Sequence, residues 1–155
     1  MHPTSLQRTE NALAAIAAAG DEGRRIFPRV SAPAALAAAR AADARAASGT
    51  PLGPLDGCVV SVKDLFDVAG EPTTAGSAVL RSAAPAMQDA AIVQRLRAAG
   101  AVIVGKTNMT EFAFSGVGIN PHFGTPGNAL DATRIPGGSS AGAGVAVARG
   151  FSDIS

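Results

Sequence analysis

The sequence predicts an α/β fold with a parallel sheet. Two short apolar runs, residues 58–64 ("CVVSVKD") and 101–105 ("AVIVG"), have the length and the β-branched content of buried strands. Between them, residues 89–100 ("DAAIVQRLRAAG") carry apolar side chains at helical spacing and close on a glycine, which is a common end of a helix. The order of strand, helix and strand is typical of an α/β layer in which the strands run parallel.

The first fifty residues predict a helical segment in front of this layer. They are dominated by Ala, Leu and Arg, and two runs, residues 11–20 and 32–48, predict helices separated by Pro28 and Pro33. No residue there forms a convincing catalytic group. We therefore expect a helical segment over residues 1–50, followed by an α/β portion over residues 51–155.

The remaining elements follow the second strand. Residues 106–116 ("KTNMTEFAFSG") predict a short helix capped by Thr107 or Asn108, with Glu111 in its first turn. Residues 116–138 are rich in Gly, Pro and Asn, which favours an irregular segment. A last helix is expected to begin at Ser139 or Ser140, and its small side chains would allow it to pack closely against a sheet.

Composition indicates one domain that binds a small molecule. The chain has 155 residues, of which 47% are hydrophobic and 16% charged, with a formal net charge of +1. Such a weak charge provides no long-range attraction to nucleic acid or to a membrane surface. With one cysteine, Cys58, and no Cys/His cluster, we expect no disulfide, no metal and no cofactor, and we expect a cytoplasmic protein.

The serine pair Ser139 and Ser140, preceded by Gly137 and Gly138, has several interpretations. A phosphate-binding loop of the P-loop type would need a lysine that is missing, and the dinucleotide pattern lacks its third glycine because Val147 stands there. A binding site for a small anion, without catalysis, remains open. So does a purely structural serine cap.

A nucleophile elbow is a further interpretation, because "GSSAG" places Ser140 in the pattern G-x-S-x-G. The elbow should follow a buried strand, which residues 131–137 do not resemble, and its histidine should come after the serine. Both histidines, His2 and His122, come before it.

A lysine is then the base that could activate a serine. The chain has only two lysines, Lys63 and Lys106, and each follows an apolar strand where loss of hydration would favour a neutral amine. Either one could instead pair with a neighbour such as Asp64. Position alone does not choose between them.

Three blocks, "VSVKDLFDVAG", "GAVIVGKTNMTEFAFSG" and "RIPGGSSAGAGVAVARG", together resemble the amidase signature family in content, order and spacing. The resemblance implies an α/β fold with a mixed sheet flanked by helices, of which this chain would hold only the N-terminal portion. It also implies cleavage of a carboxamide C–N bond by a Ser–cisSer–Lys triad. The base would be Lys63 and the bridging serine Ser139, preceded by a cis bond from Gly138.

The same resemblance implies that the chain is not the whole machinery. The nucleophilic serine and the oxyanion hole would follow about two dozen residues after Ser139, so the 155-residue fragment is expected to be inactive. Phe114 and Ser115 would contact a small-molecule amide, while Gly137, Gly138 and Ser140 would shape the loop. The resemblance leaves open a homodimer, and it also allows the glutaminase subunit of a tRNA-dependent amidotransferase with its partner subunits.

Overall fold

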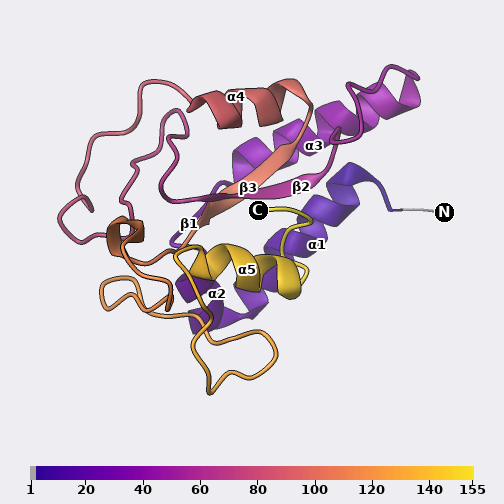
Figure 1. Ribbon diagram of the computed structural model, residues 1–155. Helices are drawn as coiled ribbons and strands as arrows, with labels where there is room; N and C mark the ends of the chain where they lie inside the picture. The colour runs from indigo at the N-terminus through magenta and orange to yellow at the C-terminus, as the bar shows by residue number, and fades with distance from the viewer. Residues whose placement is uncertain (1–2) are drawn as a thin grey trace.

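The computed structural model describes residues 3–155, which form a three-stranded mixed sheet flanked by helices (Figure 1). The strand order is β1–β3–β2, with β2 (Val59–Lys63) parallel to β3 (Val102–Thr107) and β1 (Arg29–Val30) antiparallel to it. The helices are α1 (Ser5–Ala18), α2 (Gly20–Ile26), α3 (Ala32–Ala47), α4 (Ala91–Ala98), the short 3₁₀ helix η1 (Glu111–Ala113) and α5 (Ala141–Ala148). The parallel pair confirms the strand–helix–strand prediction.

Side chains along β3 alternate between the two faces of the sheet, and each face has its own apolar cluster. Val102 and Val104 on β3 belong to a cluster that includes residues of α1, α2, α3 and α5. Ile103, which lies between them in the sequence, belongs to a second cluster with Val93 of α4. Because successive strand residues point to opposite faces, one six-residue strand supports both layers of helices.

The N-terminal segment differs from its prediction in two ways. It forms three helices instead of two, and it contributes β1 to the sheet. Pro33 does not separate helices; it lies in the first turn of α3, where the missing N–H of proline would have no intrahelical partner in any case. No helix in the described part of the chain is both long and apolar enough to cross a membrane.

The expected helix after β3 is also placed differently. Thr107 belongs to β3, where it pairs with Lys63, and the residue at the N-cap position of η1 is Thr110. The amide of Asn108 is occupied elsewhere, since its Nδ2 donates to the carbonyl oxygens of Arg25 (2.8 Å) and Gly124 (2.7 Å). Strand pairing and these tertiary bonds override the local capping pattern, so the cap predicted at Thr107 or Asn108 is wrong.

Candidate functional site

Lys63 and Ser139 meet at the end of β2, although 76 residues separate them in the sequence. Lys63 Nζ donates a hydrogen bond to Ser139 Oγ over 2.7 Å. Lys63 is the last residue of β2, and Ser139 lies two residues before the start of α5. The strand therefore delivers the amine, and the loop before α5 delivers the hydroxyl.

The loop that carries Ser139 is held by backbone hydrogen bonds. The Gly138–Ser139 peptide bond is cis, as the family resemblance implied, and Gly137 has a φ of 80°, a conformation that favours glycine. The N–H of Thr110 donates to the carbonyl oxygen of Ser139 (3.0 Å), and the N–H of Gly138 donates to that of Gly116 (2.8 Å). The bridge to Lys63 thus rests on a backbone position fixed from two sides.

A side chain on Gly138 would collide with its surroundings. A Cβ at this position would lie 2.7 Å from the backbone nitrogen of Gly118 and 2.9 Å from Thr110 Oγ1. Packing this tight explains why a glycine precedes Ser139. It also brings the segment that contains Ser115 against the loop.

The surroundings of Lys63 favour its neutral form. Partial burial lowers the pKa of the Lys63 amine from its ordinary value, because loss of hydration penalises the charged state. A neutral amine has a lone pair as well as N–H groups. The Lys63–Ser139 contact can therefore carry a proton from Oγ to Nζ as well as hold the hydroxyl in place.

Lys106, the other lysine, is engaged elsewhere. Its Nζ lies 2.7 Å from Asp64 Oδ1 and donates to Thr73 Oγ1 (2.8 Å) and to the carbonyl oxygen of Pro72 (3.1 Å). Its side chain is 1% exposed. The structure thus distinguishes the two lysines that the residue pattern left equivalent.

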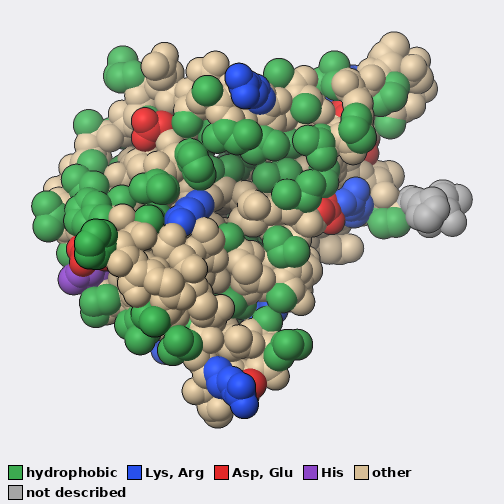
Figure 2. Space-filling model, viewed as in Figure 1, with side chains coloured by type: hydrophobic (Ala, Val, Ile, Leu, Met, Phe, Trp, Pro, Cys, Tyr) green, Lys and Arg blue, Asp and Glu red, His purple; other side chains and the backbone are tan. Residues whose placement is uncertain are grey.

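Ser140 occupies the N-cap position of α5, but its side chain makes no capping hydrogen bond. It is exposed and lines a groove of about 340 Å³ together with Lys63. Apolar side chains of Phe66, Ile92 and Leu96 form much of the remaining wall. Figure 2 shows hydrophobic side chains gathered below α4 on this face.

Three backbone N–H groups around the serine pair, all from glycines, have partners within the protein. Gly142 donates to the carbonyl oxygen of Asn108 (2.8 Å) and Gly144 to that of Ser140 (3.1 Å), while Gly138 is engaged with Gly116. An anion site at this loop would need such N–H groups to point at the ligand. These three N–H groups are therefore not directed at a ligand.

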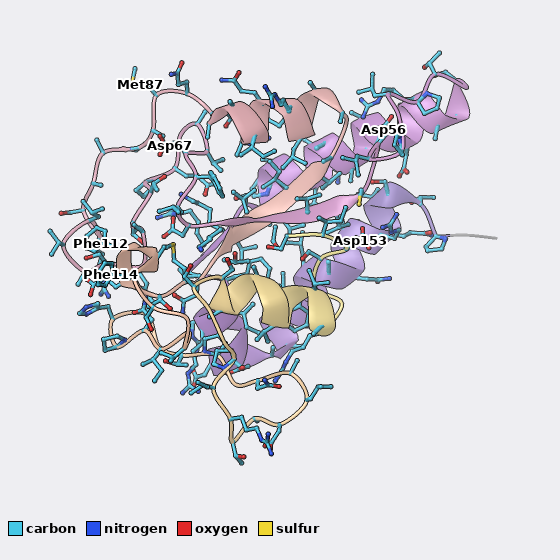
Figure 3. The ribbon with its side chains drawn as sticks, in the orientation of Figure 1. Asp56, Asp67, Met87, Phe112, Phe114 and Asp153 are labelled. Atoms are coloured by element: carbon cyan, nitrogen blue, oxygen red, sulfur yellow. The ribbon has the colours of Figure 1, made fainter. Side chains whose placement is uncertain are left out.

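Phe114 and Ser115, the expected substrate contacts, lie just beyond η1. The side chain of Phe114 is 93% exposed, and Figure 3 shows it next to Phe112 at the end of the molecule that η1 occupies. Ser115 Oγ accepts a hydrogen bond from the N–H of Val117 (3.3 Å). Contact of either residue with a substrate stays a prediction.

Residue patterns missed two contributors to the site, Thr110 and Asn108. Thr110 holds the carbonyl of Ser139, and Asn108 ties the end of β3 to α2 and to the segment around Gly124. Asn108 directly follows β3, and the residue pattern predicted it as a helix cap instead; no pattern pointed to Thr110.

Comparison with known proteins gives consistent matches across the chain. The family model described as "Amidase" matches residues 8–155. The glutamyl-tRNA(Gln) amidotransferase A subunit from Acidothermus cellulolyticus is 50% identical over 131 residues, which are 84% of this chain and 26% of that protein. Its counterpart from Chloroflexus aurantiacus is 46% identical over 147 residues, 95% of this chain and 30% of that protein.

Solved structures match the fold as well. A chain from a vestigial protein complex, described in connection with the origins of an s-triazine catabolic enzyme, has a TM-score of 0.90 and 44% identity, and the match covers 97% of this chain and 33% of that one. The native peptide amidase from Stenotrophomonas maltophilia has a TM-score of 0.85 and 35% identity, and the match covers 97% of this chain and 32% of that one. The chain therefore spans about a quarter to a third of the length of these matches.

Proposed function

Because the chain belongs to the amidase family, we propose that Lys63 and Ser139 are the base and the bridging serine of a Ser–cisSer–Lys relay. In this relay a serine amidohydrolase cleaves the C–N bond of a small carboxamide. The observation that carries the proposal is the 2.7 Å contact from Lys63 Nζ to Ser139 Oγ beside the cis Gly138–Ser139 bond. The lowered pKa of Lys63 supports it, since a base must be unprotonated to act.

The proposed chemistry moves one proton along the relay and back. Neutral Lys63 accepts the proton of Ser139 as Ser139 accepts that of the nucleophilic serine, whose oxygen forms a bond to the carbonyl carbon. The proton then returns through Ser139 to the amide nitrogen, and the C–N bond breaks to leave an acyl-enzyme. Water attacks the acyl group by the same route and releases the acid.

This chain supplies only part of that machinery in our proposal. The base and the bridge are present, whereas the nucleophile is expected in sequence that the longer relatives contain and these 155 residues do not. We therefore expect the 155-residue chain alone to show no amide turnover, because losing a nucleophile costs many orders of magnitude in rate.

The test compares two proteins, the 155-residue chain and the gene product that carries it, by ammonia release from a panel of amides. In an active gene product, Lys63→Ala and Ser139→Ala should each lower kcat/KM by at least about 100-fold, since acid–base groups typically contribute that much. Ser48→Ala, at the C-terminal end of α3, is the matched control and should leave the rate unchanged.

Two results would overturn the proposal. Full activity in Lys63→Ala or Ser139→Ala would remove the relay. Turnover by the purified 155-residue chain that Ser139→Ala abolishes would show that the nucleophile lies within these residues.

A second function, the glutaminase subunit of a tRNA-dependent amidotransferase, is favoured by one observation. The amidotransferase protein from Acidothermus cellulolyticus shares 50% identity with this chain, against 35% for the peptide amidase. Ammonia release from glutamine, with co-purification of other subunits, would support this function. Hydrolysis of peptide amides by the isolated gene product would support the general amidase.

A further inference from the structure

We propose that Lys106 is a positioning residue: it occupies the carboxylate of Asp64 and so leaves the amine of Lys63 to Ser139. This inference rests on the proposed role of Lys63 as the base. It assigns a task to the second lysine, which the relay itself does not use.

Strand register places the two lysines close together with different surroundings. Lys63 pairs with Thr107 across β2 and β3, and Val62 pairs with Lys106. Paired residues share a face of the sheet and successive residues alternate, so Lys63 and Lys106 lie on opposite faces. Asp64 directly follows Lys63, at the point where the strand ends.

All the donors of Lys106 have partners. An ammonium group has three N–H donors, and three oxygen atoms surround Lys106 Nζ, from Asp64, Thr73 and Pro72. The side chain is 1% exposed. No free position remains through which Lys106 could exchange a proton with a substrate, so its role must act through the groups that it holds.

Asp64 is fixed through both its side chain and its backbone. Its carboxylate, 5% exposed, accepts from Lys106 and from the hydroxyl of Thr74. Its N–H donates to the carbonyl oxygen of Thr107 (3.0 Å), and its own carbonyl accepts from the N–H of Ala75 (2.9 Å). The Cα atom of Lys63 is one peptide unit away, about 3.8 Å, so the same bonds fix the start of the Lys63 side chain.

A buried carboxylate is stabilised by a cation, and the cation in contact with Asp64 is Lys106. Removing one partner of a buried ion pair leaves a charge that is costly to bury. Without Lys106, the ammonium form of Lys63 would be the neighbouring cation along the chain, and Asp64 would favour that charged form. Less of Lys63 would then be in the neutral form that can accept a proton, and Asp64 would compete with Ser139 for its amine.

The other charged groups around the two lysines contact partners other than Asp64 or lie outside the groove of Lys63. The described residues that line its groove include no Asp, Glu, Arg or His side chain. On the packed elements, α4 carries the exposed Arg95 and Arg97, and Arg149 follows the end of α5. Arg29 of β1 pairs with Lys106 in the sheet, and its Nε lies 3.9 Å from Glu71 Oε2. These groups are the same in every variant below.

The test measures the basicity of Lys63 by competitive acetylation with acetic anhydride as a function of pH, read by mass spectrometry. An added lysine peptide serves as the internal reference. Lys63 is the more accessible of two lysines and Lys106 is buried, so the signal belongs to one site. Circular dichroism verifies that each variant is folded.

Lys106→Met should raise the pH midpoint of Lys63 labelling by about one unit, because an unpaired carboxylate nearby stabilises the ammonium form. The double variant Asp64→Asn/Lys106→Met removes both charges and should return the midpoint to that of the unmodified chain. If the Lys106–Asp64 pair served structure alone, the labelling midpoint of Lys63 would be the same in the single and the double variant. That result would overturn the proposal.

Folding is addressed by a second single variant. If Lys106→Met does not fold, Lys106→Gln retains a donor for Asp64 without the charge and should show the same upward shift. Loss of folding in both single variants beside a folded double variant would overturn the proposal, because the pair would then serve stability alone. Because labelling requires no turnover, a failure of the proposal for Lys106 can be distinguished from a failure of the amidase proposal.

Discussion

Two glycines in α5, Gly142 and Gly144, have similar sequence neighbours and different surroundings. A Cβ on Gly142 would lie 2.5 Å from the carbonyl oxygen of Ile26 and 2.6 Å from the backbone nitrogen of Asn108. A Cβ on Gly144 would meet no atom within 4 Å. At the residue scale, α5 approaches α2 and the end of β3 at Gly142, and this contact helps to seat the loop that carries Ser139.

We expect opposite effects of alanine at these positions. Gly144→Ala should raise the free energy of unfolding by up to about 1 kcal/mol, since alanine is the better helix former. Gly142→Ala should lower it, because the backbone atoms that it would meet cannot yield as a flexible side chain can. Urea denaturation of both variants measures the difference. Equal stability would contradict the close packing of α5 at Gly142.

At the scale of elements, one ion pair ties α3 to the turn before β2. Arg45 of α3 donates to Asp56 through Nε (2.9 Å) and Nη2 (2.5 Å). The hydrogen bonds from Arg45, assisted by the N–H of Leu52, lower the pKa of Asp56 to about 2 against the opposing effect of burial. A Cβ on Gly100, just after α4, would touch Asp56 Oδ1, so three elements converge on this carboxylate.

The lowered pKa predicts a pH-dependent contribution to stability. Asp56 binds protons less readily in the folded chain than in the unfolded one, so its contribution is present above pH 3.8 and is lost as the pH falls toward about 2. Asp56→Asn should therefore destabilise the protein at neutral pH, and its deficit should shrink between these two values. Denaturant unfolding at several pH values measures the deficit.

Asp21→Asn is the control for this prediction. Asp21 pairs with Arg24 on the surface of α2, where both side chains are largely exposed. Exposed pairs contribute little, so the change should stay within about 0.5 kcal/mol at every pH. A constant deficit for Asp56→Asn across the acid range would contradict the pKa argument.

At the scale of the whole molecule, the N-terminal segment and the α/β portion share one core. Ile26 and Phe27 are 0% and 3% exposed, and they belong to the same apolar cluster as Val102 and Val104 of β3. Arg29 pairs with Lys106, so β1 closes the edge of the sheet next to β3. The helical segment is thus packed into the structure that positions Lys63.

A chain reduced to residues 51–155 should not unfold cooperatively. Deleting the first fifty residues would expose the apolar face that β3 turns toward α1 and α3. Thermal melting followed by circular dichroism should show a broad, shallow transition, against a sharp one for the 155-residue chain. A sharp melt with protected β3 amides in the shortened chain would contradict this prediction.

Several local features were predictable from residues alone. Apolar periodicity predicted the two strands, which end near Lys63 and Thr107. Gly100 predicted the end of the helix between them, and its φ of 83° in the structure is one that favours glycine. The cap at Thr107 or Asn108 was predicted wrongly, because the pattern of a cap is local and the bonds of Asn108 reach Arg25 and Gly124. Propensity describes a few neighbouring residues and contains nothing about partners elsewhere in the chain.

The α/β class, the parallel order of strand, helix and strand, and the small side chains that let α5 pack closely all follow from the order of the residues along the chain. The sequence also contained the three blocks that resemble the amidase signature family. Only the tertiary structure showed that Lys63 reaches Ser139 while Lys106 turns to Asp64. Lys63 is the last residue of β2 and Lys106 the last but one of β3. Lys63 pairs with Thr107 and Lys106 with Val62, so the two lysines point to opposite faces of the sheet.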